Sequence, residues 1–153
     1  MKALEHKVPP PVVAVTVGAI MWGLSLPGVA ALPRSHAGTA VGIVIAALGV
    51  AAAVLGNIAF RRARTTVNPF EPETASSLVT SGIYRVTRNP MYVGMLLVLV
   101  GWAVFLANGL AVIAIALFPA YITRFQIKPE ERALMALFGE QYASYSSHVR
   151  RWL

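Results

Sequence analysis

The sequence predicts an all-α fold, that of a polytopic membrane protein with four transmembrane helices. Hydrophobic residues make up 57% of the chain and charged residues only 12%, whereas about 25% of the residues are charged in an ordinary soluble domain. The mean hydropathy of +0.66 agrees with this excess of apolar residues. Its 153 residues suit a single membrane domain, residues 1–153, better than several domains.

Four apolar runs approach the ~20 residues that a helix needs to cross a bilayer. They cover about residues 12–31, 39–60, 91–107 and 110–127. The third and fourth runs are separated only by Asn108 and Gly109, a pair typical of turns. These two spans are therefore predicted to form a tight antiparallel hairpin.

The second span carries a glycine at every seventh residue. Gly42, Gly49 and Gly56 share one face of the predicted helix, and the lack of side chains there lets a neighbouring helix approach closely. We expect a packing role for this face. It could also serve a dimer, so the oligomeric state stays open.

The basic residues predict the orientation of the chain in the membrane. With the N-terminus inside, twelve lysines and arginines lie in the inner segments, and only Arg34 lies outside. Such a bias is typical of cytoplasmic loops. We therefore expect a cell inner (plasma) membrane protein with both termini and the loop 61–90 in the cytoplasm. The net charge of +7 reports this topology, and no nucleic-acid partner is predicted.

A cytoplasmic, interfacial helix is predicted over residues 129–149. Pro129 suits a first helical turn, and Glu130 and Glu131 follow where the helix dipole favours acids. An apolar stripe with spacings of three or four is typical of a helix lying on a surface. It consists of Leu134, Leu137, Phe138, Tyr142, Tyr145 and Val149. The Arg-Arg-Trp sequence at 150–152 also suits the membrane surface.

Residue counts exclude several kinds of site. The chain has no cysteine, which excludes disulfides, thiolate metal ligands and cysteine nucleophiles. His6, His36 and His148 lie far apart, so no metal site is predicted. All six acids are glutamates outside the predicted spans, whereas a proton-coupled transporter usually carries an ionisable group at membrane depth.

Polar and aromatic residues gather instead at the predicted cytoplasmic interface. Asn89 and Pro90 begin the third span as an N-cap followed by proline, and free N–H groups at such a helix start attract anions. Tyr84 and Tyr92 offer aromatic surface with a polar tip. Glu130 and Glu131 could meet a cationic group from the other side of the hairpin.

Each of these features also has a structural interpretation. Asn89 is equally typical of a plain helix cap, and the two tyrosines are typical of a membrane aromatic belt. Glu130 and Glu131 are common first-turn acids. Arg85 and Arg88 could anchor the loop to anionic lipid.

Two blocks of sequence resemble the isoprenylcysteine carboxyl methyltransferase family. They are LVTSGIYRVTRNPMYVG and EERALMALFGEQYASYSSHVRR, with the predicted hairpin between them. The resemblance covers roughly residues 65–151. That family is grouped with the phospholipid N-methyltransferases, integral-membrane enzymes that use S-adenosylmethionine. The resemblance therefore implies a membrane methyltransferase with this cofactor.

Carried over by position, the resemblance implies a set of cofactor-binding residues. Leu78, Val79 and Tyr84 would line the cofactor pocket, and Glu130 would contact the cofactor through its ammonium group. The family's Arg-His-Pro-x-Tyr segment, which wraps the cofactor, corresponds to Arg88 followed by Asn89, Pro90, Met91 and Tyr92.

The chain departs from the family pattern at two positions. Asn89 replaces the histidine of the motif, and asparagine keeps hydrogen bonding but cannot become a cation. Gln126 stands where the family carries an arginine that holds the substrate carboxylate, and Arg124 and Lys128 flank it. Arg124 is therefore the candidate for contact with the acceptor.

The acceptor is predicted to be lipophilic and to enter from the lipid bilayer. A carboxylate acceptor is already ionised and needs no base, whereas an amine must lose a proton, for which Glu131 or Glu130 is the nearest candidate. The basic inner face favours an anionic acceptor, such as the carboxylate of a prenylcysteine-like molecule. A phospholipid N-methyltransferase, an NADPH-dependent membrane reductase and a non-catalytic scaffold protein remain alternatives.

Overall fold

The computed structural model describes residue 5 and residues 7–26, 28–63 and 77–153, which form helices joined by turns. In chain order the elements are α1 (Pro10–Ser25), α2 (His36–Arg62), the short 3-10 helix η3 (Gly82–Arg85), α3 (Pro90–Leu106), α4 (Gly109–Ala114), α5 (Leu117–Ile122), the π-helical segment η4 (Thr123–Ile127) and α6 (Lys128–His148). In these ranges the β-type pairing is limited to an isolated bridge between Ala31 and Asn108. The prediction of an all-α chain is confirmed.

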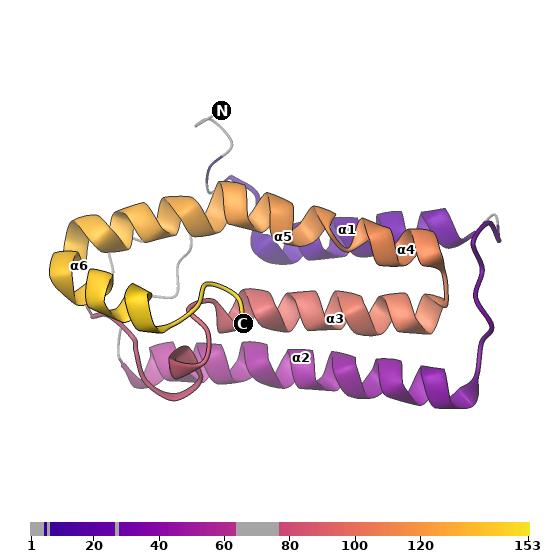
Figure 1. The fold of residues 1–153 in the computed structure, drawn as a ribbon, viewed down its shortest axis with the longest axis horizontal. Helices are drawn as coiled ribbons and strands as arrows, with labels where there is room; N and C mark the ends of the chain where they lie inside the picture. The colour runs from indigo at the N-terminus through magenta and orange to yellow at the C-terminus, as the bar shows by residue number, and fades with distance from the viewer. Residues whose placement is uncertain (1–4, 6, 27, 64–76) are drawn as a thin grey trace.

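The long helices run along a common axis and stack in layers (Figure 1). α3 lies between α2 on one side and α1 with α4 on the other. α5, η4 and α6 continue the line of α4 past the start of α3. Gly139 then bends α6 back with φ 47° and ψ −120°, a conformation open to glycine at little cost. This bend returns the C-terminal residues to the start of α3.

The glycines of the second span pack against α3 of the same chain. A Cβ on Gly49 would lie 2.5 Å from the carbonyl oxygen of Gly94, and one on Gly42 would lie 2.8 Å from that of Gly101. Gly56 faces Pro90 and Met91 in the same way. The close approach expected from the sequence is therefore made within the monomer, and this face is not free to serve a dimer.

Pro119 divides the predicted fourth span, residues 110–127. Proline has no N–H and crowds the carbonyl four residues before it. Accordingly, the helix breaks at Ile115 and Ala116, one turn before Pro119. Pro129 likewise follows the π-helical segment, whose wider turn accommodates it. The helix predicted from residue 129 is thus continuous with the fourth span, and Gly109–His148 forms one column that bends back at Gly139.

The ends of the first helix also differ from the apolar run at 12–31. α1 stops at Ser25, and Gly28 and Ala30 then adopt positive φ angles of 70° and 58°, which no α-helix contains. Hydropathy alone does not detect such a turn. Residues 64–76, within the predicted loop 61–90, lie outside the described residues.

Hydrogen bonds join the two connections at the end of the bundle opposite the C-terminus. Asn108, 1% exposed, caps α4 through its Oδ1 and donates from Nδ2 to the Val29 carbonyl at 2.8 Å. The backbone N–H of Leu32 donates to the Ala107 carbonyl at 2.7 Å, and that of Gly109 to Ala30 at 3.0 Å. The loop after α1 is therefore fixed to the turn between α3 and α4.

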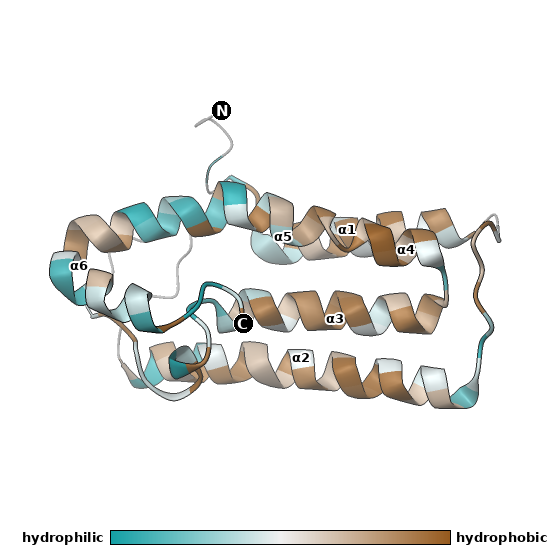
Figure 2. Cartoon of the chain, viewed as in Figure 1, coloured by the Kyte–Doolittle hydropathy of each residue, from teal (hydrophilic) through white to brown (hydrophobic). Residues whose placement is uncertain are grey.

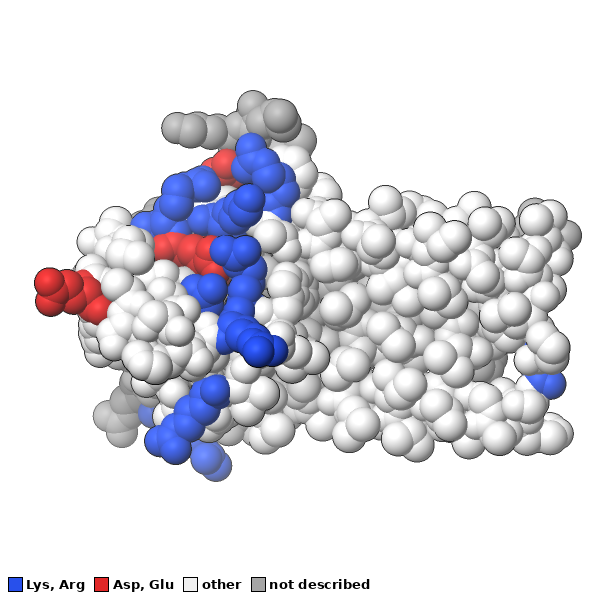
Figure 3. All heavy atoms as spheres, viewed as in Figure 1, with Lys and Arg blue, Asp and Glu red and all other residues white. Residues whose placement is uncertain are grey.

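The surface of the bundle is that of a membrane protein. α2 and the column Gly109–His148 are long and apolar enough to cross a membrane, while α1 and α3 are apolar but shorter. Large apolar side chains are exposed, such as Val15 at 73% and Ile113 at 71%. The helices of the bundle are mostly hydrophobic, and hydrophilic residues gather in α6 (Figure 2). Lysines and arginines gather near one end of the face seen in Figure 3.

Candidate functional site

The candidate site lies at this charged end, where the start of α3 meets the start of α6. Pro90 opens α3, and Tyr92 follows in its first turn with 7% exposure. Its hydroxyl donates a hydrogen bond of 2.5 Å to Oε1 of Glu130, in the first turn of α6. These two residues are 38 positions apart in sequence, and the hairpin of α3 and the α4–α6 column brings them together.

Glu130 has an unusual carboxyl group for a first-turn acid. Burial raises its pKa to about 7, the hydrogen bond from Tyr92 acts in the opposite direction, and the charge of Glu131 raises it further. Its carboxyl accepts a hydrogen bond from the Tyr92 hydroxyl, and no arginine or lysine among the described residues pairs with it. A desolvated carboxyl of this kind is well placed to bind a cationic group.

Glu131, unlike Glu130, is surrounded by positively charged side chains. Its two carboxylate oxygens accept hydrogen bonds from Nε and Nη2 of Arg151 at 2.9 and 2.8 Å. Arg88 adds an ion pair at 3.3 Å from its Nη2. The pairing with Glu131 also raises the pKa of Arg151. This carboxylate is held by two cations, and its oxygens are already occupied.

The C-terminal residues form part of the site. The side-chain amide of Asn89 donates to the Arg151 carbonyl at 2.8 Å, and the N–H of Arg88 donates to the Arg150 carbonyl at 2.9 Å. Trp152 donates from its indole to Thr123 Oγ1 at 3.2 Å. Asn89 is the N-cap residue of α3 by position, yet its side chain makes no capping hydrogen bond. Its amide holds the C-terminal segment instead.

Tyr84 lies near the same pair. It is 5% exposed, and its ring packs edge-on against Phe60 at a centroid distance of 5.3 Å. Burial, and then the charges of Tyr145 and Glu130, raise the pKa of Tyr84 above its ordinary value. The Tyr145 hydroxyl donates to the Tyr84 carbonyl at 2.7 Å, which ties η3 to α6.

The other residues suggested by the sequence lie around this centre. Pro90 and Met91 face Gly56 of α2, so they pack the helix pair. Val79 is buried at 7% exposure, and Leu78 is partly buried. Within the described part of the chain, no hydrogen bond or ion pair joins these four side chains to Glu130.

Arg124 points toward the N-terminal segment. Its guanidinium lies 3.6 Å from Glu5, which also pairs with Arg132. Gln126, two residues further on, is fully buried and donates from Nε2 to the Val8 carbonyl at 2.8 Å. Its Oε1 has no hydrogen-bond partner. The buried side chain on this turn is therefore the neutral amide of Gln126, whereas Arg124 pairs with Glu5.

Sequence reasoning missed the part played by Arg151. The Arg-Arg-Trp sequence suggested a membrane-surface anchor, but Arg151 holds Glu131 and its carbonyl holds Asn89. The spacing of 20 residues between Arg151 and Glu131 gives no local signal. Only the bend at Gly139, which the single predicted helix 129–149 did not include, brings them together.

Comparison with known proteins finds one matching family and several named relatives. Residues 37–141 match the family described as phospholipid methyltransferase. A probable protein-S-isoprenylcysteine O-methyltransferase of Oryza sativa subsp. indica is 33% identical over 113 residues, which are 74% of this chain and 59% of that protein. The Homo sapiens protein-S-isoprenylcysteine O-methyltransferase is 35% identical over 79 residues, 52% of this chain and 28% of that protein.

A shorter relative comes from Haemophilus influenzae. This uncharacterized protein is 43% identical over 63 residues, 41% of this chain and 100% of that protein. The chain therefore spans at most 59% of the two methyltransferases compared above. The matched region includes both α3 and the beginning of α6, the elements that carry Tyr92 and Glu130.

Proposed function

We propose that this chain, which belongs to the phospholipid methyltransferase family, transfers a methyl group from S-adenosylmethionine to a lipophilic acceptor at the membrane surface. The family membership agrees with the resemblance seen in the two sequence blocks. It supports a membrane methyltransferase, and the donor and acceptor are our inference.

The Tyr92–Glu130 pair carries this proposal. S-adenosylmethionine, when bound, supplies a methyl group on a sulfonium, and it also bears an ammonium group. The Glu130 carboxyl is desolvated and its recorded partner is a neutral hydroxyl, so it suits that ammonium group. Tyr92 fixes the carboxyl in position. Leu78, Val79, Tyr84, Asn89, Pro90 and Met91 complete the proposed cofactor-binding set.

In our proposal, the protein acts mainly by positioning the methyl donor and the acceptor. Methyl transfer from a sulfonium is an in-line displacement, in which alignment and exclusion of water supply most of the acceleration. Arg88 and Arg151 fix Glu131, the residue next to Glu130, and so hold the first turn of α6 against α3. Asn89 is held by the same C-terminal segment.

A carboxylate is the first candidate for the acceptor group, in keeping with the relatives named as O-methyltransferases of isoprenylcysteine. It requires no proton transfer at neutral pH, and Arg124 remains the candidate to contact it. Such contact would require Arg124 to exchange its pairing with Glu5 for the acceptor.

An amine is the second candidate, and one observation favours it. The pKa of Glu130 is raised by burial to about 7, which suits a general base near neutral pH. Glu131, the other candidate base, is already paired with two arginines. On an amine acceptor the proton would therefore pass to Glu130 in our proposal, and in that case the carboxyl would act as the base in place of pairing with the ammonium group of the cofactor.

We also propose that the chain forms one domain with four spans and both termini in the cytoplasm. The helices α1, α2 and α3 and the column from α4 to η4 would be the spans. The basic end of the bundle seen in Figure 3 supports placing that end at the cytoplasmic surface of the inner membrane.

Calorimetric binding of S-adenosylmethionine to the protein in lipid nanodiscs tests the donor. We expect the wild type to bind and Glu130→Gln and Tyr92→Phe to bind more weakly. Glu140→Gln is the matched control, because Glu140 is exposed on the same helix. Absence of binding by the wild type would refute the methyltransferase proposal.

The type of product separates the two acceptors. Radiolabelled methyl groups are offered with N-acetyl-S-farnesylcysteine or with phosphatidylethanolamine in the nanodiscs. A carboxyl methyl ester releases its label as methanol in alkali, whereas an N-methyl group does not. Label that survives alkali would exclude the carboxylate and leave the amine.

A further inference from the structure

We infer that Arg88 binds the carboxylate of the methyl donor through its Nε–H, while Glu130 binds the ammonium group of the same molecule. S-adenosylmethionine is an amino acid as well as a sulfonium, and its carboxylate and ammonium group share one carbon atom. The proposed function assigns the ammonium group to Glu130 and leaves the carboxylate without a partner. This inference rests on the proposed function and adds to it the second half of the amino-acid site.

The guanidinium group of Arg88 is the observation that carries this inference. The side chain is 14% exposed, and its Nε is buried with no hydrogen-bond partner among the described residues. The other two nitrogens are engaged, because Nη1 donates to the Tyr142 hydroxyl at 3.1 Å and Nη2 lies 3.3 Å from Glu131. A buried donor without an acceptor costs free energy, and more so on a charged group. An acceptor supplied by a ligand at Nε would therefore stabilise the site.

The charges around Arg88 also favour an anionic ligand. Glu131 already accepts two hydrogen bonds from Arg151, at 2.9 and 2.8 Å, and such a bidentate pair satisfies a carboxylate without a second cation. Arg88 approaches Glu131 through one nitrogen only, at 3.3 Å. Two guanidinium groups thus share the carboxylate of Glu131. A ligand carboxylate next to Arg88 would compensate the positive charge that remains.

Arg88 and Glu130 belong to one cluster of side chains. Burial raises the pKa of Tyr145 to about 12, and the charge of Arg88 acts in the opposite direction. Burial, and then the charges of Tyr145 and Glu130, raise the pKa of Tyr84. Tyr145 therefore lies within electrostatic reach of Arg88 on one side and of the Tyr84–Glu130 pair on the other. An amino-acid group that spans part of this cluster could meet both charged binders.

The start of α3 adds to the attraction for an anion. Asn89, its N-cap residue, turns its side-chain amide to the Arg151 carbonyl and makes no capping hydrogen bond. The first N–H groups of α3 thus have no side-chain cap, and together with the helix dipole they favour a negative group. Arg88 directly precedes Asn89, so its charge and this helix start act on adjacent positions.

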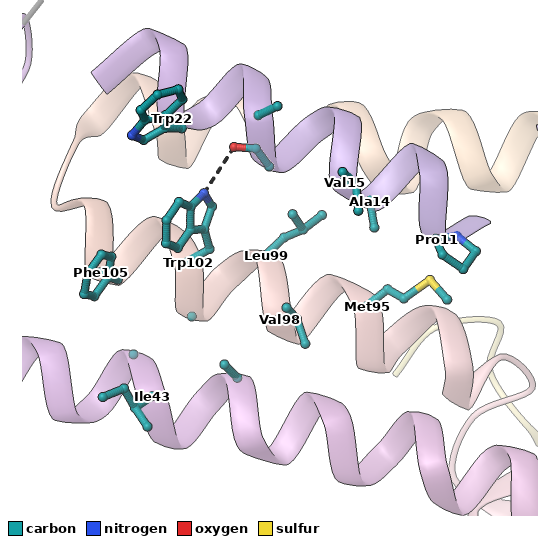
Figure 4. A pocket seen from close by; sticks show the side chains of 15 residues that line it. Pro11, Ala14, Val15, Trp22, Ile43, Met95, Val98, Leu99, Trp102 and Phe105 are labelled. Atoms are coloured by element: carbon teal, nitrogen blue, oxygen red, sulfur yellow. Dashed lines mark hydrogen bonds between the residues drawn. The ribbon is translucent and has the colours of Figure 1, made fainter. Parts of the chain in front are cut away.

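The apolar groove between α1, α2 and α3 offers no comparable place for the carboxylate. None of the residues that line it is charged. The indole N–H of Trp102 already donates to the Gly18 carbonyl at 3.1 Å, as the dashed line in Figure 4 shows. The carboxylate of the donor is therefore expected at the charged end of the bundle, next to Arg88.

Decarboxylated S-adenosylmethionine tests this inference, because it keeps the sulfonium and the ammonium group and lacks the carboxylate. Calorimetry in lipid nanodiscs measures the affinity of both compounds. We expect the wild type to bind S-adenosylmethionine about tenfold more tightly, a difference of about 1.4 kcal/mol. Arg88→Gln should lose this preference. Arg88→Lys should keep part of it, because lysine retains the charge but lacks the planar guanidinium.

Two further variants serve as controls. Arg85→Gln removes an exposed arginine at the end of η3 and should keep the preference of the wild type. Glu130→Gln should weaken both compounds, since both carry the ammonium group, and should still prefer S-adenosylmethionine. If Arg88→Gln weakened both compounds equally, Arg88 would have only a structural role and the inference would be wrong.

The wild type alone separates this inference from the proposed function. Equal affinity for the two compounds would overturn the carboxylate site and leave the proposed methyl donor in place. A wild type that binds neither compound would refute the proposed function and this inference together.

Discussion

At the scale of single residues, two adjacent glutamates have different electrostatic surroundings. Glu131 is neutralised by Arg88 and Arg151, while Glu130 is desolvated and bound to a neutral hydroxyl. Neighbours on a helix point about 100° apart, so one faces the arginines and the other faces Tyr92. Environment, rather than residue type, thus separates a structural acid from a candidate ligand-binding acid.

The raised pKa of Glu130 predicts pH-dependent binding of S-adenosylmethionine. Below about pH 7 the carboxyl is mostly protonated and cannot pair with an ammonium group. We therefore expect the affinity to rise about tenfold per pH unit up to pH 7 and then to level off. Calorimetry between about pH 5.5 and 7.5 measures this. Glu130→Gln should abolish the slope and Glu140→Gln should keep it. A flat wild-type profile would contradict this assignment.

Arg151 and Arg150 allow a second comparison between neighbours. The Arg151 side chain makes two hydrogen bonds to Glu131, whereas Arg150 contributes its carbonyl and exposes its side chain. We expect Arg151→Ala to weaken binding of S-adenosylmethionine by about fivefold, in line with about 1 kcal/mol for a partly exposed ion pair. Arg151→Lys should restore only part of it, because lysine lacks the planar fork.

The control for this experiment is Arg150→Ala, which should bind as the wild type does. Circular dichroism should show the same helix content in both variants. If Arg150→Ala weakened binding as much as Arg151→Ala, general loss of positive charge would explain the effect. The positioning role of Arg151 would then be wrong.

At the scale of elements, α2 and α3 pack with their backbones in close contact. Gly49 and Gly94 leave no room for a Cβ on either helix, and Gly42 and Gly101 repeat the arrangement two turns away. Because Met91 and Pro90 pack on Gly56 of α2, this pair also fixes the start of α3. The position of Tyr92 therefore depends on glycines that lie within the apolar bundle.

Gly49→Ala should destabilise the protein although alanine favours helices. The new Cβ would lie 2.5 Å from the Gly94 carbonyl oxygen, and forcing the helices apart costs about 1–3 kcal/mol. Gly23→Ala is the control, since nothing lies within 4 Å of its Cβ and it should be neutral or stabilising by up to about 1 kcal/mol. Thermal unfolding in detergent, followed by tryptophan fluorescence, compares them. Equal melting temperatures would contradict the close packing.

At the scale of the whole molecule, charge and hydropathy predict the orientation of the chain in the membrane. Exposed apolar side chains cover the bundle, and basic residues gather at one end (Figure 3). The candidate site lies at that end, between the start of α3 and the C-terminal residues. In the proposed function, a soluble cofactor and a lipid-borne acceptor meet there without either crossing the membrane.

The absence of cysteine makes the topology easy to test. His36→Cys marks the start of α2, and Ser147→Cys marks the end of α6; both positions are exposed. With bacterial cells intact, an impermeant maleimide should label only His36→Cys, because α6 is expected in the cytoplasm. Lysed cells should show labelling at both positions. Labelling of Ser147→Cys in intact cells would reverse the orientation.

The sequence predicted the helices better than their junctions. Apolar runs located α2 and α3 to within a few residues, because a bilayer requires long uninterrupted helices. The break before Pro119 and the bend at Gly139 depend on single backbone positions within patterns that otherwise favour helix. The family resemblance singled out Tyr92 and Glu130, which the structure brings within hydrogen-bonding distance. The role of Arg151 was not predicted, because Arg151 reaches Glu131 only after the chain folds back.

The hydrogen bonds around Asn108 have a consequence for motion. The loop after α1 and the turn before α4 are joined by hydrogen bonds at one end of the bundle. The opposite end is joined by side chains and by the C-terminal segment. Both ends of α3 are therefore tied to segments distant in sequence. A ligand that enters between Tyr92 and Glu130 would have to shift the C-terminal segment, while the hydrogen bonds at the Asn108 end keep the rest of the bundle in place.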